Sequence, residues 1–181
     1  MSTEQERIQE ILGTLKKRGE ENRLNYYEPY KFQERFHSAG AEANQRLLMA
    51  ANRVGKSYVG AMEMAAHLTG LYPKWWKGKK FGKPIRAWVC GASNETTRDI
   101  CQKELFGQPD NPRDKGKGSI PKHLIGETTR KPGVPNAHSS VLVKHSTGGW
   151  SRVAFKAYEQ GAEKFMGESL DLIWLDEEPP Q

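Results

Sequence analysis

The chain has 181 residues, a net charge of +6 and a pI of about 9.3, and 36% of its residues are hydrophobic. This size and composition suit one domain with a hydrophobic core, and they exclude a disulfide-stapled miniprotein and a wholly disordered chain. No apolar run approaches the roughly 18–20 residues that cross a bilayer, and the polar N-terminus lacks a signal-peptide core, so we expect an intracellular protein without membrane contact. Cys90 and Cys101 are too few for a disulfide framework and predict reduced, structural thiols.

Residues 1–28 predict an N-terminal helix that ends near Gly19, followed by an arm. Thr3 and Glu6 have the spacing of a capping box, in which each side chain bonds a free backbone N–H at the helix start. Pro29 suits the first turn of a second, short helix. Apolar side chains follow at helical spacing on both helices: Ile8, Ile11, Leu12 and Leu15 on the first, Phe32 and Phe36 on the second.

From residue 46 onward, short apolar runs alternate with helical patterns, which predicts an α/β fold with a mainly parallel sheet flanked by helices. Residues 107–136 contain ten Gly or Pro among thirty and predict a long surface loop. The other expected elements are a buried strand over 47–51, a turn over 52–55, a helix over 56–69 stopped by Gly70, a strand over 85–90, a helix from Ser93 or Asn94 to about 106, a hairpin of strands 140–144 and 152–157, and a strand over 172–175.

The segment from Ala50 to Ser57 fits the phosphate-binding pattern G-x-x-x-x-G-K-[ST], except that Ala50 replaces the first Gly. It lies between a predicted strand and a predicted helix, as a P-loop requires. Such a turn points successive backbone N–H groups at an anion, and the helix adds the positive end of its dipole. Ala50 implies that the first position needs no positive φ. The expected nucleotide-binding residues of this turn are Ala51, Asn52, Arg53, Val54, Gly55, Lys56 and Ser57.

Three side chains of this turn have expected chemical roles. Lys56 can neutralise the β- and γ-phosphates, and Ser57 can bind Mg²⁺ through its hydroxyl. Arg53 can stabilise charge on the transferred phosphoryl group as an arginine finger, or it can pair with a carboxylate elsewhere. The alternative for the whole segment is a chance G-K-S sequence at a helix start, which the preceding apolar run disfavours.

A second motif consists of the four apolar residues 172–175 followed by Asp176 and Glu177. A buried parallel strand delivers its functional groups at its C-terminal end, so we expect Asp176 near Ser57 as a Mg²⁺ ligand. Glu177 would orient and deprotonate the attacking water. Alone, the motif is also typical of a strand that ends in solvent; with the phosphate turn it predicts a P-loop NTPase of the class with additional strands and a catalytic Glu. The predicted catalytic residues are Glu177, Lys56 and Arg53.

The sequences M-A-A-N-R-V-G-K-S, over residues 49–57, and G-E-S-L-D-L-I-W-L-D-E-E-P, over residues 167–179, together resemble the large terminase subunit of tailed bacteriophages. The resemblance covers roughly residues 26–181. It implies a Mg²⁺-dependent ATPase that couples ATP hydrolysis to translocation of double-stranded DNA into a prohead, in the host cell cytoplasm. The implied partners are double-stranded DNA, the portal protein, the small terminase subunit and further copies of the chain in a ring.

The terminase family also places an adenine-reading Gln before its P-loop, and residues 29–33 are similar to that segment. The resemblance implies that Gln33 pairs with the adenine edge and that Tyr30 stacks on the ring, whereas a surface Gln on an amphipathic helix is the alternative. Met166 stands where the family often carries Arg, so no role is transferred to it. The resemblance also divides the chain into an N-terminal helix and arm, 1–28, and an ATPase domain, 29–181, that stops before the family's coupling motif and nuclease domain.

Charge is distributed unevenly along the chain. Residues 159–181 hold seven acids and one base, whereas residues 1–158 hold 27 bases and 15 acids. Within that basic body, residues 73–86 hold six bases, no acid and three aromatics. Such a segment can neutralise DNA phosphates without reading sequence, or it can be a solvated connection that its Trp pair anchors to the core. The loop over 107–136 is a second candidate for contact with DNA or a neighbouring subunit.

Two other functions remain open. A superfamily 2 helicase-like ATPase would share the phosphate turn but would separate strands, which an unwinding assay detects. A nucleotide-dependent assembly module would bind ATP without turnover. Measuring ATP binding and phosphate release on the same sample distinguishes that module from an enzyme.

Overall fold

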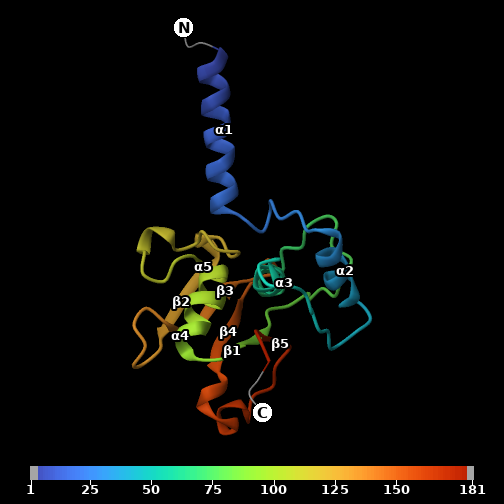
Figure 1. The fold of residues 1–181 in the computed structure, drawn as a ribbon, viewed down its shortest axis with the longest axis vertical. Coiled ribbons are helices and arrows are strands. Elements are labelled where there is room, and N and C mark those ends of the chain that lie inside the picture. The colour runs from blue at the N-terminus through green and yellow to red at the C-terminus, as the bar shows by residue number, and fades with distance from the viewer. Residues whose placement is uncertain (1–3, 179–181) are drawn as a thin grey trace.

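A five-stranded sheet with the strand order β2-β3-β4-β1-β5 forms the centre of the protein in the computed structural model, which describes residues 4–178 (Figure 1). The strand pairs β1–β4 and β1–β5 are parallel, and the pairs β2–β3 and β3–β4 are antiparallel. The α/β class is thereby confirmed, with the parallel pairs at the end of the sheet that carries β5. The strands are β1 Arg86–Gly91, β2 Ile125–Arg130, β3 His138–Lys144, β4 Trp150–Ala157 and β5 Leu172–Leu175.

The main helices agree with the expected pattern. Gly70 ends α3 in the left-handed conformation, with φ 68°, and its N–H donates to the Ala66 carbonyl. Ser93 caps the helix after β1, because its side chain accepts the Thr96 N–H. That helix contains a π-helical turn between two short α-helical segments. The helices are α1 Glu4–Glu21, α2 Lys31–Ala39, α3 Lys56–Thr69, α4 Asn94–Thr96, the π-turn η1 Thr97–Gln102 and α5 Lys103–Phe106, and the 3₁₀ turns are η2 Pro112–Asp114, η3 Lys122–Leu124, η4 Tyr158–Gln160 and η5 Ala162–Phe165.

Three expectations from the sequence are wrong in detail. Residues 47–51 do not form a buried strand: they have no regular secondary structure, and Leu47 and Met49 are 81% and 80% exposed. An apolar run becomes a strand only where a neighbouring strand supplies backbone partners, and Arg46 instead holds the start of this run against α2, through the Phe36 carbonyl. The loop over 107–136 contains strand β2, and Pro29 lies just before the N-cap residue Tyr30 rather than in the first turn of α2.

The first helix, α1, extends away from the rest of the protein (Figure 1). None of its residues is buried, and its apolar stripe is exposed to solvent. Thr3 of the expected capping box lies outside the described residues. Among residues 4–178, no helix has both the length and the apolar character needed to cross a membrane. The exposed stripe consists of Ile8, Ile11, Leu12 and Leu15.

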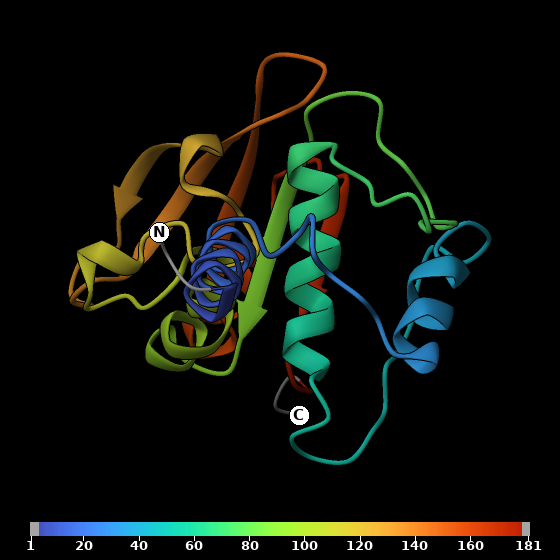
Figure 2. The ribbon, with the colours of Figure 1, turned by 90° about the horizontal axis from the view of Figure 1, so that it is seen from above.

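Helix α3 runs along one face of the sheet and is the central element of the core (Figure 2). Apart from Glu63, His67 and Thr69, its residues from 59 to 69 are apolar or glycine, and residues 61–69 are all buried. The helix that follows β1 packs beside it, through Leu105 and Phe106. Alternate residues of three strands belong to the same core cluster as these helices, namely Ala87 and Val89 of β1, Val141 and Val143 of β3, and Val153 and Phe155 of β4.

One glycine sets how closely α3 approaches β5. A Cβ built on Gly60 would lie 2.5 to 2.8 Å from three atoms of the Trp174 indole, so no larger residue fits there without displacing the ring. Trp174 is half-buried and packs against the core. The N-terminal end of α3 is therefore held against the C-terminal half of β5.

Gly60→Ala should destabilise the fold by about 1–3 kcal/mol, because the added methyl overpacks the contact with Trp174. Urea unfolding measures the change. Gly13→Ala is the matched control, because Gly13 lies within α1 and no atom comes within 4 Å of the place its methyl group would take, so that substitution should not destabilise. Equal unfolding midpoints for the two variants would show that the contact is loose.

Candidate active site

The phosphate-binding turn has the backbone geometry of an anion nest at the start of α3. Gly55 is the N-cap residue of α3 and adopts the left-handed conformation, with φ 85°. Arg53 is also left-handed, with φ 64°, whereas Ala50 is not among the residues with positive φ. The expectation that the first position needs no positive φ is confirmed. Alternating right- and left-handed residues turn successive N–H groups toward one point, where the helix dipole is also positive.

The Lys56 side chain folds back over this turn. Its ammonium donates to the Ala50 carbonyl at 2.8 Å and to the Ala51 carbonyl at 2.9 Å. Both acceptors are neutral, so an anionic phosphate oxygen would form the stronger, charge-assisted bond with the same group. The Lys56 ammonium thus lies at the turn, where it can exchange its two carbonyl partners for the oxygens of an anionic ligand.

Ser57 and Asp176 meet, as the two motifs predict. The Asp176 N–H donates to the Cys90 carbonyl at 2.8 Å, which extends the β1–β5 pairing by one residue and fixes the carboxylate at the end of the strand. Burial raises the pKa of the Asp176 carboxyl, and a hydrogen bond from the Ser57 hydroxyl opposes that rise. A hydroxyl and a carboxylate side by side are hard oxygen donors of the kind that Mg²⁺ prefers.

Two further side chains bond to Asp176 and were not foreseen from the sequence. The Cys101 thiol and the Trp174 indole both form side-chain hydrogen bonds with its carboxylate. Burial also raises the pKa of the Cys101 thiol, so it stays protonated and can donate. No sequence pattern marked Cys101, because it approaches Asp176 only through the π-helical turn η1.

Glu177 follows on the exposed side of the strand end, in a strained backbone conformation with φ 66°. The Tyr158 hydroxyl donates to its carbonyl at 3.3 Å, which supports this turn. Glu177 shares a small cavity with Asp176, and strained non-glycine residues of this kind concentrate at functional sites. The cavity is lined by Gly91, Ala92, Thr96, Ile100, Cys101, Asp176 and Glu177.

Arg53 is exposed and forms no ion pair with any carboxylate in the described part of the chain. The alternative in which it pairs with a carboxylate elsewhere therefore has no support within residues 4–178.

Gln33 lies next to the phosphate-binding turn. It is buried, so it is not a surface Gln on an amphipathic helix, which was the alternative interpretation. It is 3% exposed, and its amide oxygen accepts the Tyr30 N–H at 2.9 Å. Its amide nitrogen lies 3.4 Å from the position that a Cβ on Gly55 would take. Tyr30 is 71% exposed and stacks on Phe32, with ring planes 8° apart. The Gln33 amide thus lies beside the turn, and the exposed Tyr30 ring precedes it by three residues at the start of α2.

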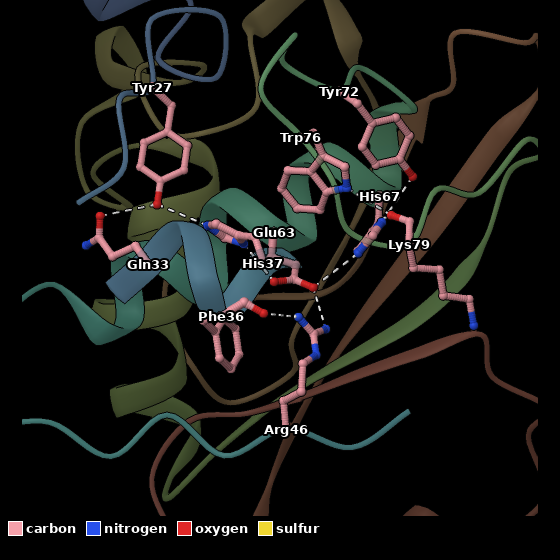
Figure 3. Close-up of polar contacts among 10 residues, drawn as sticks. All are labelled: Tyr27, Gln33, Phe36, His37, Arg46, Glu63, His67, Tyr72, Trp76 and Lys79. Carbon is pink, nitrogen blue, oxygen red and sulfur yellow. Dashed lines mark hydrogen bonds and ion pairs between the residues drawn. The ribbon is translucent and has the colours of Figure 1, made fainter. Parts of the chain in front are cut away.

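A buried ionic cluster around Glu63 supports this arrangement (Figure 3). The Glu63 carboxylate accepts from Arg46, from His37 at 2.8 Å and from His67 at 3.3 Å. Hydrogen bonds from His37 and His67 and the charge of Arg46 together outweigh burial and hold the pKa of Glu63 below its usual range. The sequence signal for this cluster was a single acid within the apolar run of α3, next to histidines that show no metal-ligand spacing.

The Glu63 cluster joins three separate segments. Arg46 belongs to the chain that enters the phosphate-binding turn, and its guanidinium also donates to the Phe36 carbonyl of α2 at 2.9 Å. His67 is 3.0 Å from the Tyr72 hydroxyl, which in turn accepts the Phe81 N–H at 2.7 Å. The cluster therefore ties α2, α3 and the segment from 72 to 81 into one unit.

The basic segment over 73–86 is anchored as the second sequence interpretation proposed. Trp76 is buried, and the Trp75 indole donates to the Tyr27 carbonyl at 3.3 Å. The charged groups nonetheless remain on the surface, so the anchored segment presents a row of cations to solvent. The exposed bases are Lys74, Lys77, Lys79, Lys80, Lys83 and Arg86.

The chain matches the family model described as the terminase large subunit, T4likevirus-type, N-terminal, over residues 47–181. The chain belongs to this terminase family. It is 39% identical over 174 residues to the terminase large subunit of Salmonella phage P22, a match that covers 87% of the chain and 35% of that relative. The chain thus spans about a third of that relative's length.

The fold of this terminase segment is similar to that of the large terminase ATPase domain of Thermus phage P74-26. The TM-score is 0.54 at 16% sequence identity, over 84% of this chain and 55% of that domain. The likeness confirms the expected α/β fold.

Glu63→Ala should cost about 3–5 kcal/mol of unfolding free energy at neutral pH, because it leaves the Arg46 charge buried without its partner. The folded-state pKa of Glu63 lies below the ordinary value of 4.5, so its ionised form stabilises the fold above that pH. The contribution falls as the pH drops below 4.5 toward the folded-state pKa. Urea unfolding of both proteins across this range should show the difference shrinking in acid; a constant difference would mean that Glu63 acts through packing alone.

Proposed function

We propose that this segment is the ATPase domain of a phage terminase large subunit, which couples ATP hydrolysis to translocation of double-stranded DNA into a prohead. The observation that carries the proposal is the meeting of Ser57, at the positive end of α3, with Asp176 at the end of β5. These two positions come from motifs about 119 residues apart. Their convergence beside an anion nest is the arrangement that phosphoryl transfer requires.

The proposed mechanism assigns one task to each group. The backbone N–H groups of residues 51–56 hold the phosphates, and Lys56 exchanges its carbonyl partners for phosphate oxygens. Ser57 and Asp176 would hold Mg²⁺, which when bound offsets the phosphate charge. Glu177 orients the attacking water in line with the scissile bond and accepts its proton. Arg53, free of any described carboxylate partner, stabilises the charge that develops on the transferred group.

Base recognition would come from the segment that precedes the P-loop. We assign adenine pairing to the Gln33 amide and stacking to the exposed Tyr30 ring. The free Gln33 nitrogen beside Gly55 and the aromatic face one turn away support this assignment. A paired amide can discriminate between bases because adenine and guanine present different donors and acceptors.

Packaging implies further partners. The exposed bases of residues 73–86 suit contact with DNA phosphates, because such contact needs charge without sequence readout. In the assembled motor, the chain would act as part of a homo-oligomeric ring with the portal protein and the small terminase subunit, in the host cell cytoplasm.

Lys56→Ala should remove most of the affinity for ATP, because the nest loses its one lysine charge. Glu177→Gln should retain binding but lower turnover by about 10²-fold or more, because the amide cannot accept the proton. Calorimetric ATP binding and phosphate release, measured on the same preparation, test both variants. Normal hydrolysis by the Glu177→Gln protein would show that another group is the base, and binding without any release in the parent protein would favour an assembly module.

Replacing Lys77 and Lys83 with Gln should weaken binding to random-sequence duplex DNA and reduce the slope of log affinity against log salt by about 0.9 for each phosphate that is no longer neutralised. The matched control replaces Lys16 and Lys17 of α1, which changes the net charge equally but outside the basic segment. Fluorescence anisotropy at several salt concentrations measures both slopes. Identical slopes for the two double variants would remove residues 73–86 from the DNA-binding surface.

A further inference from the structure

The Tyr27 hydroxyl lies between the Glu63 cluster and Gln33 (Figure 3). It is 3.1 Å from the second ring nitrogen, Nε2, of His37 and 3.5 Å from the amide oxygen of Gln33. Both neighbours are able to accept a hydrogen bond, but a phenol has a single proton. The direction of that proton therefore decides whether the Gln33 oxygen is occupied.

The proton on His37 can be assigned from its partners. The Glu63 carboxylate is ionised and accepts only, so the Nδ1 of His37, 2.8 Å away, must carry a hydrogen. A His37 ring that carries this one proton has a bare Nε2, which accepts the Tyr27 proton at the shorter of the two distances.

Gln33 consequently keeps one acceptor site free. A carbonyl oxygen has two lone pairs, and the Tyr30 N–H takes one of them at 2.9 Å. Because the Tyr27 proton points to His37, the second lone pair has no donor within residues 4–178. No hydrogen bond from the Gln33 nitrogen forms within residues 4–178, so that group is open as well.

We propose that Glu63 and His37 are positioning residues that give the nucleotide site its preference for adenine, by directing the Tyr27 proton away from Gln33. The proposal rests on the proposed function of Gln33 in reading the base. Adenine offers a donor beside an acceptor, its exocyclic amine and a ring nitrogen, which match the free oxygen and nitrogen of the amide. Guanine offers two acceptors on that edge. A Gln33 oxygen saturated by Tyr27 would leave only the amide nitrogen, which bonds either base.

Glu63→Gln reverses this chain of hydrogen bonds. Arg46 has only donors, so the new amide must keep its oxygen toward Arg46 and turn its NH₂ toward His37. His37 Nδ1 then accepts, its Nε2 carries the proton and donates to the Tyr27 oxygen, and the Tyr27 proton moves to Gln33. The ratio of the dissociation constants of GDP and ADP should fall by about tenfold, the value of one lost discriminating bond.

Tyr27→Phe in the Glu63→Gln background should restore the ratio, because a phenyl ring cannot donate to Gln33. A general loosening of the fold would not be repaired by removing a second hydroxyl. Tyr72→Phe is the matched control: it removes a buried hydroxyl on the opposite, His67, side of Glu63, and should leave the ratio unchanged. An unchanged ratio in folded Glu63→Gln protein, or no recovery in the double variant, overturns the proposal.

Two measurements keep the test decisive if Glu63→Gln fails to fold. Nitrogen-15 spectroscopy of the His37 imidazole in the unaltered chain should show a protonated Nδ1 and a bare Nε2; a protonated Nε2 overturns the proposal. Gln33→Ala separates this idea from the proposed function. If Gln33→Ala leaves the GDP-to-ADP ratio unchanged, Gln33 does not read the base. If Gln33→Ala abolishes the preference and Glu63→Gln does not, only the positioning role fails.

Discussion

The close contact between Gly60 and the Trp174 indole is the constraint on which the site depends. Ser57 lies one turn before Gly60 on α3, and Asp176 lies two residues after Trp174 on β5, so each pair shares a face of its element. Packing α3 against the Trp174 indole therefore brings the Ser57 hydroxyl to the Asp176 carboxylate. Any residue larger than Gly at position 60 would separate the two motifs, although it would leave both sequences intact.

The same helix meets a second, polar constraint one turn further along, at Glu63. Because α3 is buried on all sides, Glu63 cannot reach solvent and must find its partners among neighbouring segments. Those partners are cationic or donor groups from α2, from the residues before the P-loop and from α3 itself. The Glu63 cluster thus holds the residues that precede the phosphate-binding turn. The contact between Gly60 and Trp174 holds the helix that follows the turn against β5.

The sequence predicts the parts of this site that follow local rules and misses those that depend on packing. Helix α3, its Gly70 stop and the Ser57–Asp176 meeting were predictable, because capping, periodicity and strand-end placement are local or topological. The absence of a strand over 47–51 was not predictable, because a strand needs a neighbouring strand to pair with, and the composition of one segment does not reveal it. Cys101 and His37 were missed for a related reason: each acts through a group distant in sequence, and neither belongs to a recognisable spacing pattern.

Three non-glycine residues among residues 4–178 have a left-handed backbone, and two of them lie at the proposed site. Arg53 and Glu177 both adopt the left-handed conformation without being glycine, at a cost of about 1–3 kcal/mol each. One lies in the phosphate turn and the other directly after the strand that carries Asp176. Neither is held by a buried side chain, since both side chains are exposed, so packing of their own side chains does not explain the conformation. The conformation instead sets the direction of the chain at the two points where a phosphate and its attacking water would have to meet.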